Sequence, residues 1–159
     1  MNLSKQVANQ FREVQLNGKW VVTTNLKTQL MDLTWEQVTT KIGSLNTISD
    51  LTFHLNYYVA GILNVMEGGS LDIRDKYSFD CPPIESQKDW EKLLNKMVHD
   101  AERFADLLEQ MPDEKLLGDF VEKKYGNYYK NIHALIEHSY YHLGQIVMIK
   151  KMMHEGFKI

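Results

Sequence analysis

The sequence predicts an all-α protein. Four segments carry apolar residues at helical spacing, and residues that start and stop helices stand at their ends. No segment shows sustained strand alternation bounded by hairpin turns. Each predicted helix has one apolar stripe, and such stripes can be buried only against one another. The expected fold is therefore a helix bundle.

The first half of the chain is expected to begin with a helix over about 4–16, which Gly18 breaks or kinks, followed by a helical piece over 24–33.

Two capping boxes follow, in which a threonine and a residue three positions later satisfy each other's backbone N–H groups. The box at 34–37 starts a short helix that Gly43 ends. An acidic version at 47–50 starts the second long helix, which Gly68-Gly69 stop.

The second half holds two more long helices. Residues 70–83 form a predicted loop, Ser86 starts the third helix, and Pro112 ends it. The polar segment 113–127 is expected to contain a connecting loop, and the last helix is expected over about 128–154.

Composition is that of one ordinary globular domain, residues 1–159, with 43% hydrophobic and 25% charged residues. The net charge of -3 gives no electrostatic reason to expect nucleic acid or an anionic membrane as a partner. A single cysteine, Cys81, rules out an internal disulfide. No apolar run approaches the ~20 residues that span a bilayer, and the N-terminus lacks the apolar core of a signal peptide. The default expectation is a cytoplasmic protein without a membrane partner.

Three histidines lie on the apolar stripes. His138 and His142 stand four residues apart in the last predicted helix, which places both rings on one face. His54 lies on the inward stripe of the second long helix. A divalent metal ion would take the acceptor nitrogen of each ring and so remove the cost of burying it unpaired. Spacing alone leaves a second reading open, in which these are ordinary core or pocket histidines.

Two motifs resemble those of the DinB-like (damage-inducible) superfamily. The run 138–146, His-Ser-Tyr-Tyr-His-Leu-Gly-Gln-Ile, is similar to its closing motif, in which two histidines four apart precede a glycine-glutamine pair. The stretch 47–55 looks like the earlier motif, which places one histidine in the second helix. Trp20, Gly68 and Trp90 fall where such proteins often place them, so the resemblance covers nearly the whole chain.

The resemblance implies a four-helix bundle with long inter-helix loops. It also implies a site for nickel or zinc near one end of the bundle, with His54, His138 and His142 as ligands. Dimers are common in the superfamily, which makes a homodimer the expected assembly.

The function expected from such a site is that of a metal-dependent enzyme acting on a small molecule. An ion with open positions activates water, polarises a carbonyl or binds a thiolate. The resemblance implies a transferase that uses a low-molecular-weight thiol as cofactor, or a hydrolase. The alternatives are a noncatalytic metal-binding helical bundle and an interaction module. Nucleic-acid binding by the basic and aromatic residues at 123–130 is disfavoured in a net acidic chain.

The sequence names no catalytic residue. Glu137 precedes His138 and so points about 100° away from it, and Cys81 has no adjacent basic residue to activate its thiol. Two roles are possible for Gln145, one turn beyond His142: it contacts the bound ligand or the residues around the metal, or it packs against another helix. Two roles are likewise possible for Tyr57, Tyr58 and Tyr141, which either supply hydroxyl groups to the pocket or pack in the core.

Overall fold

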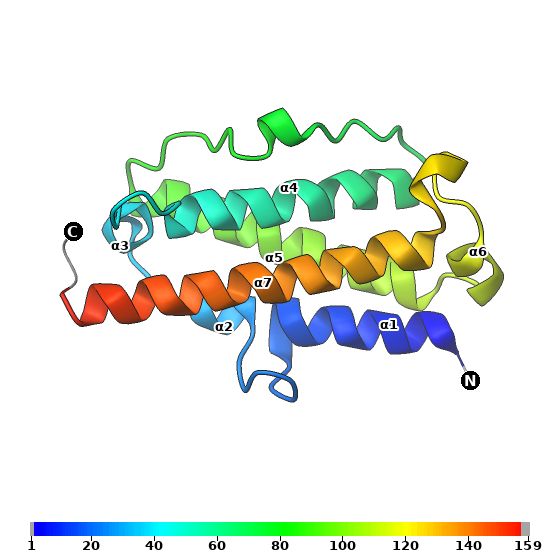
Figure 1. The fold of residues 1–159 in the computed structure, drawn as a ribbon, viewed down its shortest axis with the longest axis horizontal. Helices are drawn as coiled ribbons and strands as arrows, with labels where there is room; N and C mark the ends of the chain where they lie inside the picture. Colours follow the sequence, from blue (N-terminus) through cyan, green and yellow to red (C-terminus); the bar gives the residue numbers. More distant parts are fainter. Residues whose placement is uncertain (1, 157–159) are drawn as a thin grey trace.

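The computed structural model describes residues 2–156, and within them the chain is helical, which confirms the predicted all-α class. The four longest helices are α1 (Leu3–Arg12), α4 (Ile48–Met66), α5 (Gln87–Glu109) and α7 (Tyr128–His154). They run alongside one another down the long axis of the molecule (Figure 1). Helices α4 and α1 both pack against α5 and against α7, so the apolar stripes meet in one core. Among residues 2–156 no helix combines the length and the apolar character needed to cross a bilayer.

Shorter elements depart from the predicted boundaries. The first helix is α-helical only to Arg12 and continues as a π-helical turn over Glu13–Asn17. The piece expected over 24–33 is shorter, α2 (Leu26–Leu30), because Asn25 caps its start. The segment expected to be a connecting loop contains a short helix, α6 (Asp113–Leu117), and a 3₁₀ turn over Lys123–Tyr125.

The predicted helix starts are confirmed by their capping hydrogen bonds. Both capping boxes are complete, that of Thr34 before α3 (Trp35–Thr39) and that of Thr47 before α4. Ser86 accepts a hydrogen bond from the N–H of the third residue of α5, and Asn127 does the same for α7. These bonds satisfy N–H groups that have no partner within a helix.

The π-helical turn carries a polar side chain into the core. Gln15 is fully buried, and its amide nitrogen donates to the hydroxyl of Ser139 on α7 at 2.8 Å. The extra residue of a π turn rotates the side chains that follow it, which accounts for a glutamine on an inward face.

The connection between α4 and α5 lies along α4 as an extended segment with one 3₁₀ turn, Asp75–Tyr77 (Figure 1). The contacts that attach it there include those of Tyr57 and Gly61. The Tyr57 hydroxyl accepts a hydrogen bond from the Arg74 N–H at 2.9 Å and lies 3.2 Å from the Arg74 carbonyl oxygen. Gly61 allows Ile73 to lie directly on the helix, because a Cβ at this glycine would stand 2.3 Å from the Ile73 side chain. The segment is thus fixed over the middle of α4.

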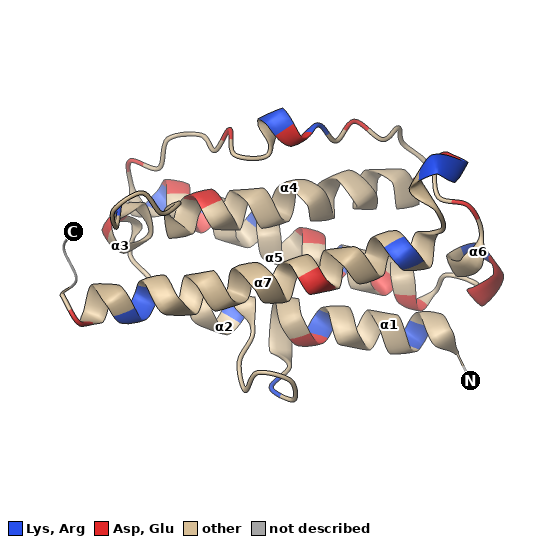
Figure 2. Ribbon diagram, viewed as in Figure 1, with Lys and Arg blue, Asp and Glu red and all other residues tan. Residues whose placement is uncertain are grey.

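Charged residues are sparse along most of α4 and along the C-terminal half of α7 (Figure 2). Asp50, in the first turn, is the only Lys, Arg, Asp or Glu of α4, and α7 has none from His138 to Ile149. A charge placed between these two stretches would have no fixed protein counter-ion on either helix.

Candidate metal centre

His54, His138 and His142 converge between α4 and α7, which confirms that the three rings share one site. The Nε2 atom of His138 lies 3.1 Å from Nε2 of His54 and 2.8 Å from Nε2 of His142. One potential ligand atom from each ring falls within 4.8 Å of the others. His54 and His142 are each 6% exposed, and His138 is half-buried. One helical turn separates the two histidines of α7, so their helix alone brings them together.

Two of the rings have their protonation fixed by a neighbour. Nδ1 of His54 lies 3.2 Å from the Ser78 carbonyl oxygen, and Nδ1 of His142 lies 2.7 Å from Oε1 of Gln145. A carbonyl oxygen only accepts, so each Nδ1 must carry the proton and donate. In a neutral ring that leaves Nε2 with a free lone pair. Both lone pairs face the Nε2 atom of His138.

This arrangement cannot satisfy itself with hydrogen bonds. Nε2 of His138 carries at most one proton, so it cannot donate a full hydrogen bond to both neighbouring lone pairs. A cation at the common point would accept all three lone pairs. Two imidazole nitrogens bound tetrahedrally at ~2.1 Å lie about 3.4 Å apart. The two distances from Nε2 of His138, 3.1 and 2.8 Å, are slightly shorter than this. The donor set and its outer partners therefore fit a divalent metal ion.

Burial keeps the three rings neutral at neutral pH. Burial, reinforced by His142 and then His54, lowers the pKa of His138 from 6.5 to about 4. Burial is also the main cause that lowers the pKa values of His54 and His142. Neutral imidazole is the form that binds metal.

Residues of the α4–α5 connection complete one side of the cluster. The ring of Phe79 stacks on His54 with centroids 4.0 Å apart, and the next residue back, Ser78, supplies the carbonyl. Tyr58 of α4 meets the edges of His54 and His138, and its hydroxyl donates to Asp75 at 3.0 Å. The sequence held no signal for these loop residues, because their approach depends on the path of an irregular segment.

A cavity of about 620 Å³ reaches the cluster at His138. Asp75 lies on one side of it, while Phe120, Tyr125 and Asn131 approach from the segment before α7 and its first turn. A volume of this size accommodates a small organic molecule. The cluster is therefore accessible from one side.

The residues that the sequence left open now have defined places. Gln145 contacts the ligand sphere, through His142. Tyr58 belongs to the site, whereas Tyr57 holds the α4–α5 connection and Tyr141 is 64% exposed with its ring beside His142. Glu137 is exposed, as expected from its position on the helix.

The other histidines, Cys81 and Trp20 lie outside the cluster of three histidines. His99 and His154 are exposed, and the ring of His133 lies beside that of Tyr129. Burial raises the pKa of Cys81 to about 11, which agrees with its exclusion as a nucleophile. Trp20 is 92% exposed in the connection after the π turn.

Comparison of the chain with protein-family models, with curated proteins and with solved structures found no match. The fold and the geometry of the three histidines are therefore the evidence for a function.

Proposed function

We propose that this chain is a divalent-metal protein of the DinB-like kind, a four-helix bundle of α1, α4, α5 and α7 that binds nickel or zinc through His54, His138 and His142. One observation carries the proposal. The outer nitrogens of two rings donate to fixed oxygens, so their inner nitrogens present lone pairs to a third ring at 2.8 and 3.1 Å. Such outer partners are a regular feature of histidine metal sites.

We propose further that the site is enzymatic and acts on a small molecule, as a thiol-dependent transferase or as a hydrolase. A bound ion would supply Lewis acidity, which activates a water, a carbonyl or a thiolate. The cavity beside His138 supports this assignment, because it gives a substrate access to the cluster. Phe79 and Gln145 hold two of the rings in place, and Tyr58 with Asp75 offers hydrogen-bonding groups at the cavity wall.

The first experiment measures metal content. Protein purified without a histidine tag is loaded with nickel or zinc, dialysed and subjected to elemental analysis. We expect one ion per chain, retention of that ion in His99→Ala, whose histidine is exposed, and loss of it in His142→Ala. Failure of the wild-type protein to retain either metal would remove the proposal.

The second experiment separates an enzyme from a noncatalytic metal protein. Low-molecular-weight thiols are screened with electrophiles, and small esters and amides are screened for hydrolysis. Turnover that disappears in His142→Ala and survives in His99→Ala supports the enzyme. X-ray absorption showing four protein ligands and no exchangeable position would instead assign the ion a structural role.

Sedimentation of the same samples tests the expected homodimer.

A further inference from the structure

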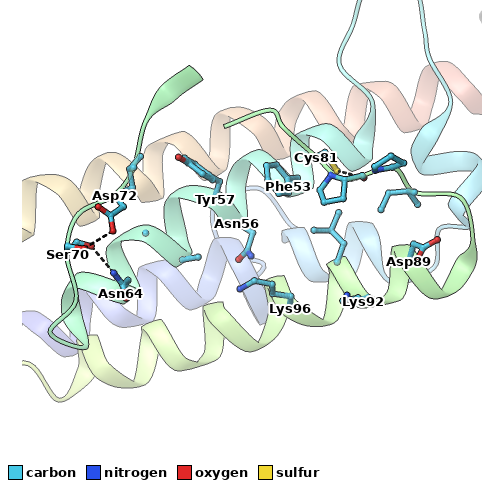
Figure 3. Close-up of a pocket in the computed structure, with 17 residues that line it drawn as sticks. Phe53, Asn56, Tyr57, Asn64, Ser70, Asp72, Cys81, Asp89, Lys92 and Lys96 are labelled. Carbon is cyan, nitrogen blue, oxygen red and sulfur yellow. Dashed lines mark hydrogen bonds between the residues drawn. The ribbon is translucent and has the colours of Figure 1, made fainter. Parts of the chain in front are cut away.

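A second cavity, of about 520 Å³, lies between α4 and α5 (Figure 3). The two helices line it together with Ser70, Asp72, Ile73 and residues 81–84 of their connection. None of the three clustered histidines lines it, because the α4 side chains involved lie on another face of the helix from His54. Its volume is in the range of small-molecule sites. The cavity is therefore separate from the candidate metal centre.

The walls of this cavity are mainly apolar. Phe53 and Leu93 line it from the two helices, and Ile73 and Ile84 line it from the connection. All four side chains are only partly buried. A ligand with an apolar body would remove their remaining surface from water, which favours binding.

The cationic groups of the lining stand on one helix. Lys92 and Lys96 are one turn apart on α5, so both ammonium groups extend along the same face. Lys96 pairs with Asp100, and Lys92 forms no ion pair within residues 2–156. Figure 3 shows both lysines along the α5 edge of the cavity.

The two carboxylates of the lining already have partners. Asp72 accepts the Ser70 hydroxyl at 2.7 Å, and Asp89 accepts the Ser86 hydroxyl at 2.6 Å in the first turn of α5. They lie toward opposite ends of the cavity, away from its middle (Figure 3). A serine hydroxyl leaves each carboxylate its negative charge, and the two lysines are the charged side chains that line the cavity between these ends.

A buried polar group fixes Lys96 at this place. Asp100 is 7% exposed, and its Oδ2 atom binds both the Lys96 ammonium and the side-chain N–H of Asn56 at 3.0 Å. Asn56 lines the cavity, is 5% exposed, and its amide oxygen has no hydrogen-bond partner among the described residues. Buried polar groups are uncommon between helices unless they are satisfied. The presence of Asn56, Lys96 and Asp100 at the floor of the cavity therefore indicates a role beyond helix packing.

We propose that the cavity binds a small amphipathic anion, an aliphatic or aromatic carboxylate. Its head group lies between Lys92 and Lys96, and its apolar body lies between Phe53 and Leu93. The site is independent of the metal centre.

The test uses octanoate as the probe and 1-octanol as its neutral match, titrated into the full chain at low salt. We expect octanoate to bind 1:1 and up to about fivefold more tightly than 1-octanol, since one accessible ion pair contributes an effect of this order. Lys92→Gln should remove most of that difference and leave 1-octanol binding unchanged. Lys88→Gln, an exposed lysine of α5 outside the lining, is the matched control and should bind like the wild type.

A filling variant tests the place of binding. Ala60 lines the cavity, so Ala60→Leu or Ala60→Phe should abolish the binding of both probes while thermal melts report an intact fold. Absence of saturable octanoate binding to the wild type overturns the proposal, as does binding that persists in both filling variants. Equal affinity for octanoate and 1-octanol overturns the anionic class. His142→Ala should bind octanoate normally, so failure of the metal proposal and failure of this one are distinguishable.

Discussion

At the scale of single residues, the proton on His142 is held by one side chain. Gln145 accepts from Nδ1 of His142 at 2.7 Å, and no charged group of α7 lies between His138 and Ile149 to do so instead. Gln145→Leu removes the acceptor and frees the ring to change tautomer and orientation. We expect nickel or zinc affinity to fall by roughly 10–100-fold, the usual effect of losing such a partner. Competition with a chromophoric chelator measures it.

The control for that variant is Gln10→Leu, because Gln10 is exposed on α1. It should bind metal like the wild type. Undiminished affinity in Gln145→Leu would show that the hydrogen bond does not orient the ring.

The sequence was sufficient to predict the three clustered histidines but not the residues of the α4–α5 connection that contact them. His138 and His142 share a face by helical geometry alone, and His54 lies on a stripe that had to face inward. The carbonyl of Ser78 and the ring of Phe79 reach His54 from an irregular segment more than 20 positions away in the chain. Neither residue type carries a signal of its own, so these contacts required the structure.

At the scale of elements, two glycines in the interiors of helices have opposite roles. A Cβ at Gly61 would stand 2.3 Å from Ile73, whereas a Cβ at Gly144 meets no atom within 4 Å. Gly61→Ala should destabilise the protein by about 1–3 kcal/mol through overpacking against the α4–α5 connection. Gly144→Ala should stabilise it by roughly 0.5–1 kcal/mol, since alanine has the higher helix propensity.

Urea denaturation of both variants measures the two free energies of unfolding. Equal stability of Gly61→Ala and wild type would mean that the connection is not held tightly on α4. Gly144 is exposed on α7, so no close approach of another helix requires a glycine at this position.

The start of α1 depends on a residue from α6. The Asp113 carboxylate accepts hydrogen bonds from the N–H groups of Ser4 at 3.0 Å and Leu3 at 3.1 Å. These bonds lower the pKa of Asp113 below its ordinary 3.8. The folded state therefore binds this proton more weakly than the unfolded chain, so the stabilisation is present above pH 3.8 and is lost as the pH falls through the folded-state pKa.

Asp113→Ala should accordingly melt at a lower temperature than the wild type at neutral pH, and the difference should shrink below pH 3.8. Thermal melts over a pH series measure it, with Glu114→Ala as the matched control. A difference that does not change with pH would assign the effect to something other than the ionised carboxylate.

Four helix starts were predictable, and at each a side chain next to the helix satisfies one of its N–H groups: Thr34, Thr47, Ser86 and Asn127. The π turn after Arg12 was not predictable, because the hydrogen bond that accompanies it joins Gln15 to Ser139 on α7, more than 100 positions later. Capping side chains next to a helix thus make its start predictable from the sequence. Features that involve contacts between residues distant in sequence, such as the π turn, are not predictable in this way.

At the scale of the molecule, the candidate metal centre joins helices from opposite halves of the chain. An ion bound only by the folded state stabilises it by about 2.7 kcal/mol when its free concentration is 100 times Kd. We expect a rise in Tm on loading with nickel or zinc that a chelator reverses. Differential scanning calorimetry measures it, and His142→Ala should show no rise. An unchanged Tm in the wild type would indicate that the ion does not prefer the folded state.

The exposed connection between α4 and α5 divides the ligands between the two halves of the chain. Trypsin cutting after Arg74 or Lys76 would leave His54 in one polypeptide and His138, His142 and Ser78 in the other. The ion would then be a bridge between two separate molecules. Its removal would let the pieces part more readily on dilution, a dependence on protein concentration that the uncut chain does not have.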